Sequence, residues 1–320
     1  MKTTVFVSLL LVMILVSLSA YLRLAHSGIG CADWPDCYGR IGDPPVEAQT
    51  ITSHNAYQRI VAEASQPLAW ATPLHRLVAS VLGLFTVWLM LLSLKFKKDR
   101  LLSLTILAVT VFLALLGVKS GGLHSPAVVM GNLGGGFLML GLLGWMFFKQ
   151  SGKQKQSEKS IPAGLLALAV FMLVAQILMG GLTSANFAAT ACQSLPDCHG
   201  AWLPGPEILT ALDLSRQHQV TSMGQVIGGQ ERTDIHIAHR LGAVATILLV
   251  LAVGLMAWRA GNRLRFAGAL VIILVATEFS IGVASVATGL PIGLAVAHNW
   301  VAGLLLLVML RISALQTYRR

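Results

Sequence analysis

Eight apolar stretches, each long enough to cross a lipid bilayer as a helix, constrain this chain more than any other feature. About 20 mostly apolar residues are needed to span the hydrocarbon core. The stretches cover residues 4–22, 76–94, 101–118, 126–148, 162–182, 238–258, 265–286 and 291–311. Only 11% of the 320 residues are charged, whereas soluble domains carry about 25%. The sequence therefore predicts an all-α integral membrane protein and excludes a soluble globule, a disordered chain and a nucleic-acid binder.

The distribution of Lys and Arg predicts how the chain lies in the membrane. Fifteen of the 23 basic residues fall at the two termini and in the connections near 95–100, 149–159 and 259–265, and eight fall on the other side. Cytoplasmic connections are the ones enriched in Lys and Arg. We therefore expect both termini in the cytoplasm and the long loops, about 23–75 and 183–237, on the periplasmic side of a bacterial inner membrane.

The two halves of the chain carry matching motifs. A Cys-x5-Cys motif ending in Pro-Asp-Cys-x-Gly occurs at 31–39 and again at 192–200, and a His-Arg-Leu motif begins at His75 and at His239. Four crossings per copy give both copies the same orientation, so we predict two parallel four-helix repeats related by a pseudo-twofold axis along the membrane normal. The predicted domains are 1–150 and 161–320, joined by a cytoplasmic linker at 151–160. Because the first apolar stretch has a counterpart at 162–182, we interpret it as a span and not as a signal peptide.

Three histidines at the outer ends of predicted spans are the main candidate site residues. His75 lies at the second span, His239 at the sixth and His298 at the eighth. Ionisable residues at membrane depth are costly and point to a functional site, although a single interfacial histidine can also be a polar end-cap. His239 and His298 belong to one four-helix unit and can face each other across its interior. Two neutral imidazoles on facing helices suit axial ligation of haem iron.

Three further charged residues accompany these histidines. Arg76 and Arg240 each follow a histidine and could pair with haem propionates, or could extend to the lipid headgroups. Glu278 lies within the seventh span, where it could relay protons or act as a neutral hydrogen-bonding acid. The residues alone do not decide between these roles.

The four cysteines, Cys31, Cys37, Cys192 and Cys198, fall in the two outer loops, on the oxidising side. Two like pairs with this spacing favour short structural disulfides, each worth about 2 kcal/mol through loop closure. Redox exchange is the functional alternative. Zinc binding is less favoured, because Cys-x5-Cys is not a zinc spacing.

Taken together, these motifs resemble heme A synthases over nearly the whole chain. The resemblance lies in the first outer loop from Arg23 to Gly39, in the second loop from Asn186 to Gly200, and in the histidine motifs around His239 and His298. It implies oxidation of a porphyrin methyl of heme O to a formyl group for cytochrome oxidase biogenesis. The partners it implies are heme O, heme A, the lipid bilayer, heme O synthase and cytochrome oxidase subunits.

The resemblance also assigns residues to roles. It implies that His239 and His298 bind the iron of a heme b cofactor in the second half. It implies that His75 binds the iron of the substrate haem in the first half and has a catalytic role there. Its cysteine pairs correspond to Cys31 with Cys37 and Cys192 with Cys198.

The sequence departs from the family pattern at two positions in the first half. Thr72 stands where the family has a Glu three residues before the first histidine, and Asn132 stands where the family has the second substrate-side histidine. Both departures motivate an alternative function, a non-catalytic haem-binding or assembly factor for the terminal oxidase. A transporter or an electron-carrying cytochrome is less favoured, because no span is interrupted at mid-membrane and all three histidines lie on one side.

Overall fold

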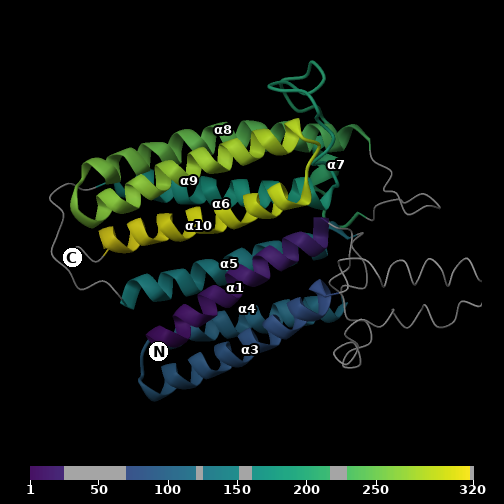
Figure 1. The fold of residues 1–320 in the computed structure, drawn as a ribbon. Helices are drawn as coiled ribbons and strands as arrows, with labels where there is room; N and C mark the ends of the chain where they lie inside the picture. The colour runs from purple at the N-terminus through teal and green to yellow at the C-terminus, as the bar shows by residue number, and fades with distance from the viewer. Residues whose placement is uncertain (25–69, 120–124, 151–160, 217–228, 318–320) are drawn as a thin grey trace, which may run out of the picture.

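A computed structural model describes the chain outside residues 25–69, 120–124, 151–160, 217–228 and 318–320 (Figure 1). The described residues form helices and connecting segments without a strand. Eight helices are long and apolar enough to cross a membrane, which confirms the predicted class of a multi-pass all-α membrane protein. They are α1 (Lys2–Leu24), α3 (Ala71–Lys95), α4 (Arg100–Lys119), α5 (Pro126–Gln150), α6 (Ala163–Ala185), α8 (Gln230–Arg259), α9 (Asn262–Ala287) and α10 (Ile292–Thr317). A short helix, α7 (Ile208–Leu212), precedes α8.

The helices extend beyond the apolar stretches that predict them. Helix α8 begins eight residues before the predicted start at 238, and α3 begins at Ala71 and not at 76. Backbone hydrogen bonding continues a helix into polar sequence, so the width of the hydrocarbon core does not set where it ends. As a consequence His75 and Arg76 lie within the first turns of α3.

The eight helices form two groups of four that lie side by side (Figure 1). In the first group, α1 and α4 each pack against both α3 and α5. In the second group, α6 and α9 each pack against α8 and α10. Helices α3 and α5 therefore face each other diagonally across the first bundle, and α8 and α10 do the same across the second.

The contacts between the two groups are consistent with the predicted repeat. Helix α10 packs against α1 and α5, and α5 also packs against α6. Arg23 Nε donates a hydrogen bond of 2.9 Å to Ser184 Oγ. These two residues occupy the same position, the twenty-second, in α1 and in α6. Equivalent positions of two copies meet at a twofold axis, so this bond marks where such an axis would pass.

Glycines bring the helices of each group close together. A Cβ added at Gly268 of α9 would lie 2.3 Å from the backbone N of Trp258 and 2.5 Å from Gly254 O of α8. Close approach of helix backbones through small residues is the usual packing mode inside a bilayer. The apolar side chains left on the outside, such as Leu84, Leu101 and Phe171, are more than half exposed, as expected for residues that face lipid.

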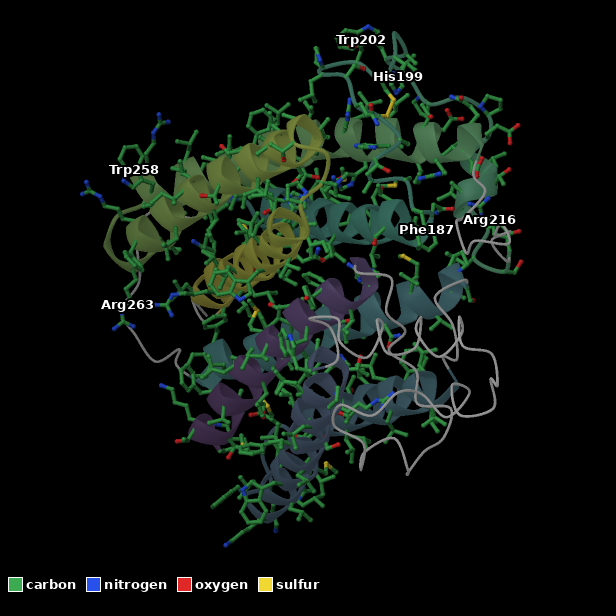
Figure 2. All side chains as sticks on the ribbon, turned by 45° about the vertical axis from the view of Figure 1, so that its right-hand side comes forward. Phe187, His199, Trp202, Arg216, Trp258 and Arg263 are labelled. Carbon is green, nitrogen blue, oxygen red and sulfur yellow. A yellow bond between two sulfur atoms is a disulfide. The ribbon has the colours of Figure 1, made fainter. Side chains whose placement is uncertain are left out.

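The two ends of the helical layer differ in charge. The end that carries His75, His239 and His298, called here the histidine end, also carries the segment with His199, Trp202 and the disulfide (Figure 2). Trp258 and Arg263 lie at the opposite end (Figure 2). This opposite end holds more of the described Lys and Arg residues than the histidine end does, and they include Lys95, Arg100 and Lys149. The division of the chain at 151–160 stays a prediction, because that segment lies outside the described residues.

Candidate functional site

His239 and His298 lie on the two helices that face each other diagonally across the second bundle. His239 is in the third turn of α8 and His298 is in the second turn of α10. A glycine lies next to each ring, since a Cβ added at Gly180 would be 3.1 Å from His239 Cε1 and one at Gly282 would be 3.6 Å from His298 Cε1. The glycines on α6 and α9 therefore leave room for rings that a larger side chain would displace.

Each of these histidines has a polar partner on a neighbouring helix. Gln176 Nε2 lies 2.9 Å from His239 Nδ1 and donates a second hydrogen bond of 2.9 Å to the His239 carbonyl. Glu278 Oε1 lies 3.3 Å from His298 Nδ1. The partner contacts are made at Nδ1 in both rings, so Nε2 is the nitrogen left for a ligand in the bundle interior. Partners at Nδ1 that orient a ligating imidazole are a general feature of metal sites.

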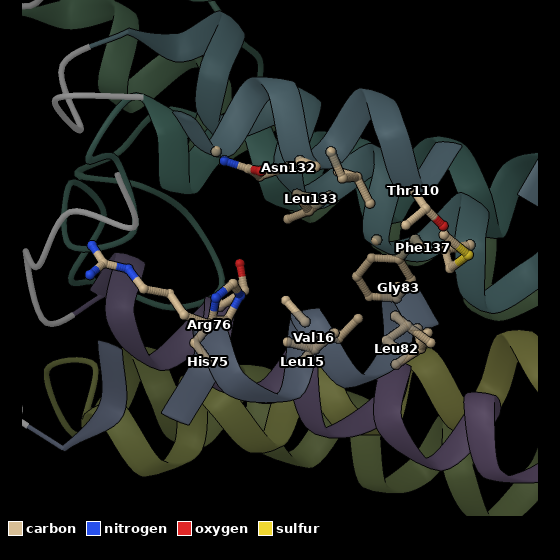
Figure 3. A pocket seen from close by; sticks show the side chains of 18 of the residues that line it. Leu15, Val16, His75, Arg76, Leu82, Gly83, Thr110, Asn132, Leu133 and Phe137 are labelled. Atoms are coloured by element: carbon tan, nitrogen blue, oxygen red, sulfur yellow. The ribbon is translucent and has the colours of Figure 1, made fainter. Parts of the chain in front are cut away.

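A cavity of about 330 Å³ lies in the first bundle, at the corresponding position. Its volume falls in the range of small-molecule pockets. Most of its wall is apolar, from residues such as Leu15, Leu113 and Phe137. His75 on α3 and Asn132 on α5 approach the cavity from opposite sides (Figure 3).

Positive charge gathers along this cavity. Arg23, the penultimate residue of α1, is 8% exposed and lines the cavity, and so does Arg76. Asn299 also lines it, although its helix, α10, belongs to the second bundle. The neighbouring residue on that helix, His298, is not among the described residues that line the cavity. An apolar chamber with guanidinium groups at the histidine end suits a flat apolar ligand that carries carboxylates.

The disulfide between Cys192 and Cys198 is present, as predicted, with Cα atoms 5.0 Å apart. The predicted pair Cys31 and Cys37 lies outside the described residues. Arg240, predicted to contact a haem propionate, holds the disulfide loop through three short hydrogen bonds. It donates from Nη1 to the carbonyls of Ser194 (2.9 Å) and Asp197 (2.8 Å), and from Nη2 to Cys192 O (3.0 Å). Its Nε is buried and has no hydrogen-bond partner among the described residues. Contact between Arg240 and a propionate stays a prediction.

We expect Arg240→Met to loosen this loop. The change removes hydrogen bonds from a charged donor, and each such bond contributes about 2 kcal/mol. The melting temperature of the purified protein in detergent should fall, and a dithiol should reduce Cys192–Cys198 faster. Arg259→Met, at the exposed end of the same helix, is the matched control and should behave as wild type. Equal melting temperatures for both variants would show that Arg240 does not anchor the loop.

Sequence reasoning missed two features of the histidine end. His236 is buried, with Nδ1 2.9 Å from the Ala188 carbonyl. Asn186 Nδ2 donates to the carbonyls of Leu182 (2.8 Å) and Ala211 (3.0 Å), while Asn186 Oδ1 accepts from Arg216 (2.5 Å). These contacts tie the loop after α6 to α7 and α8. The i, i+3 spacing of His236 and His239, which places both on one helix face, was the available signal.

These features define a multi-pass membrane protein with two polar sites at one end of paired four-helix bundles, one with histidines on two diagonally opposed helices and one with a cavity lined by a single histidine among the described residues. Comparison with known proteins places the chain within this class. The chain belongs to the COX15-CtaA family, described as cytochrome oxidase assembly protein, whose sequence model matches residues 2–310.

Individual relatives match different shares of the chain. Heme A synthase of Shewanella oneidensis is 34% identical over 315 residues, which cover 96% of this chain and 94% of that protein. Heme A synthase of Shouchella clausii is 26% identical over 82% of this chain and 78% of its own. Protoheme IX farnesyltransferase of Halobacterium salinarum is 32% identical over 120 residues, covering 37% of this chain and 21% of its own.

Proposed function

We propose that this protein is a heme A synthase, an oxidoreductase that converts a porphyrin methyl of heme O to a formyl group for cytochrome oxidase biogenesis. The observation that carries the proposal is the pairing of two different sites in one chain. A facing histidine pair suits a haem that stays bound, and a separate cavity with one histidine suits a haem that enters and leaves. Relatives that bear the name heme A synthase match this chain almost end to end.

The second bundle fits a heme b cofactor. His239 and His298 would hold its iron through Nε2, and the bound haem would supply one-electron redox chemistry. Ligation through Nε2 would leave the proton on Nδ1. Gln176 would then turn its amide to accept from His239 Nδ1 and would give up its bond to the His239 carbonyl, and Glu278 Oε1 would accept from His298 Nδ1. Both partners then keep the imidazoles aimed into the bundle and increase their basicity.

The first bundle fits the substrate haem. His75 would bind its iron, the apolar wall would cover the porphyrin face, and Arg76 would pair with a propionate. Arg23 adds a second, more deeply buried guanidinium on the same cavity. Heme O as the substrate is consistent with the partial match to a protoheme IX farnesyltransferase. Thr72 lies in the first turn of α3, where its hydroxyl offers a hydrogen bond but no carboxylate.

The distribution of charge supports a location in a bacterial inner membrane. Lys and Arg residues are more numerous at the end opposite the histidines, which supports a cytoplasmic location for that end and for both termini under the positive-inside rule. The histidine end and the long loops then face the periplasm, where the disulfide is stable. Heme O synthase and cytochrome oxidase subunits are the proposed partners for supply and delivery of haem.

A non-catalytic haem-binding or assembly factor is the alternative that Thr72 and Asn132 motivate. The near end-to-end match to a relative named heme A synthase favours the enzyme over this alternative, because a haem-binding factor would use the same cavity.

Production of heme A in a host that makes heme O tests the proposed function. In cells that express the wild-type chain, heme O should be converted to heme A or to a hydroxylated intermediate. Chromatography of the acid-extracted haems measures this conversion. A host with the empty vector should contain heme O alone, and His199→Ala, at an exposed loop histidine, should match wild type. Heme O alone beside a purified protein that holds heme b would favour the assembly factor.

A further inference from the structure

The two bundles share one helical register but present different side chains to their interiors. His75 and His239 each lie 20 residues before the last residue of their helix, α3 or α8. Asn132 and His298 are each the seventh residue of theirs, α5 or α10. Asn132 therefore stands in the first bundle where His298 stands in the second. A histidine is matched by a histidine on the diagonally opposed helix in the second bundle and by an asparagine in the first.

The residues that support the histidines differ in the same direction. Gln176, which contacts His239, is the fourteenth residue of α6, and the fourteenth residue of α1 is Leu15. Glu278, which contacts His298, lies 165 residues after Leu113 of α4, and this offset falls between those of the pair His75 and His239 (164) and the pair Asn132 and His298 (166). Both leucines line the cavity. The first bundle thus has leucines and an open apolar chamber where the second bundle has the polar partners of two histidines.

Asn132 brings an unused hydrogen-bond donor to this chamber. Its Nδ2 is buried and has no hydrogen-bond partner among the described residues. A buried donor without a partner costs about 1–3 kcal/mol, so a bound group that accepts a hydrogen bond there would be favoured. A side-chain amide is not among the ligands that proteins use for haem iron, which are His, Cys, Met and Tyr. Met139 lies on the same helix but seven residues further along, about 10 Å from the level of Asn132. It therefore does not stand at the position of the second ligand.

We propose that the first bundle binds its haem through His75 on one face only. The opposite face of the iron, towards Asn132, stays open for a small ligand such as water or a diatomic gas, to which Asn132 Nδ2 donates a hydrogen bond. This inference rests on the proposed function, because it takes the cavity to hold a haem. Hydrogen-bond donors and steric access beside an open iron position decide which small ligands bind there.

Carbon monoxide is a direct probe of an open iron position. The experiment adds heme O to the purified holoprotein, which already holds heme b, and records the ferric spin state and the carbon monoxide difference spectrum after reduction. Wild type should bind a second haem equivalent that is high-spin when ferric and binds carbon monoxide when ferrous. Heme b, with an imidazole on each face, should do neither and serves as the internal reference.

Substitutions at Asn132 and His75 separate the two faces of the iron. Asn132→His copies the residue at the equivalent position of α10 and should make the second haem low-spin, with weaker carbon monoxide binding because the new imidazole competes for the open iron position. Asn132→Leu should keep carbon monoxide binding but raise the C–O stretching frequency, because the donor is gone. His75→Gly should lose the high-spin spectrum of the His75-bound haem and regain it when imidazole is added.

Two results would overturn the inference. A second haem that is low-spin and inert to carbon monoxide in wild type would show ligands on both faces, and would leave the proposed function intact. Failure of wild type to bind a second haem equivalent at all would overturn the inference and the proposed function together. An unchanged spin state in Asn132→His would show that position 132 does not face the iron.

Discussion

His239→Ala and His298→Ala should each strip heme b from the purified protein. The two imidazoles lie on diagonally opposed helices, and each has a partner, Gln176 or Glu278, that fixes its ring. Loss of a supporting partner alone weakens metal binding by about 10–100-fold, so loss of a ligand should exceed about 100-fold. A pyridine haemochrome assay of the detergent-purified protein measures the haem that remains.

The control for this experiment is another histidine at the same end of the molecule. His199 is exposed, and its ring Nε2 lies 3.1 Å from the Ala191 carbonyl in the loop, so His199→Ala should keep its haem. Gln176→Leu, which copies Leu15 of the first bundle, should give an intermediate loss. Full haem content in His239→Ala or His298→Ala would remove the basis for a cofactor site in the second bundle.

His75→Ala should abolish heme A formation and leave heme b in place. His75 is the one imidazole among the described cavity-lining residues, so its loss frees the substrate iron to shift within an apolar chamber. Misplacement of a reacting group by about 1 Å costs about 100-fold in rate, and a larger loss is expected here. The measurement is the ratio of heme A to heme O in cells, together with the heme b content of the purified protein.

Leu77→Ala provides a matched control on the same helix, because Leu77 is 58% exposed and lies on the outer face of α3. It should reduce neither heme A nor heme b. The decisive feature is the opposite behaviour of the two bundles, since His298→Ala loses heme b whereas His75→Ala keeps it. Loss of heme b in His75→Ala would mean that the two sites are not separate, and heme A formation at the wild-type level would rule out a role for His75 in binding the substrate.

The sequence predicted the membrane spans well because burial in lipid leaves a simple signal. A spanning helix must be apolar over about 20 residues whatever packs against it, and the structure has eight such helices. The ends were less predictable, as for α8, because polar residues such as Gln230 and Arg232 continue the helix without contributing to hydropathy. Spacing and the predicted compartment favoured the Cys192–Cys198 disulfide over redox exchange and zinc binding, and the disulfide is present.

The sequence by itself also determined which residues could carry chemistry, because charged and imidazole groups are rare at membrane depth. Only the tertiary structure decided their partners. Arg240 lies beside His239 in sequence but holds a loop that is more than 40 residues away. Leu15 and Gln176 can be matched as equivalent residues only once the structure gives the starts of α1 and α6. The physical reason is that hydropathy is a property of each residue against lipid, whereas hydrogen bonds and cavities depend on which helices face each other.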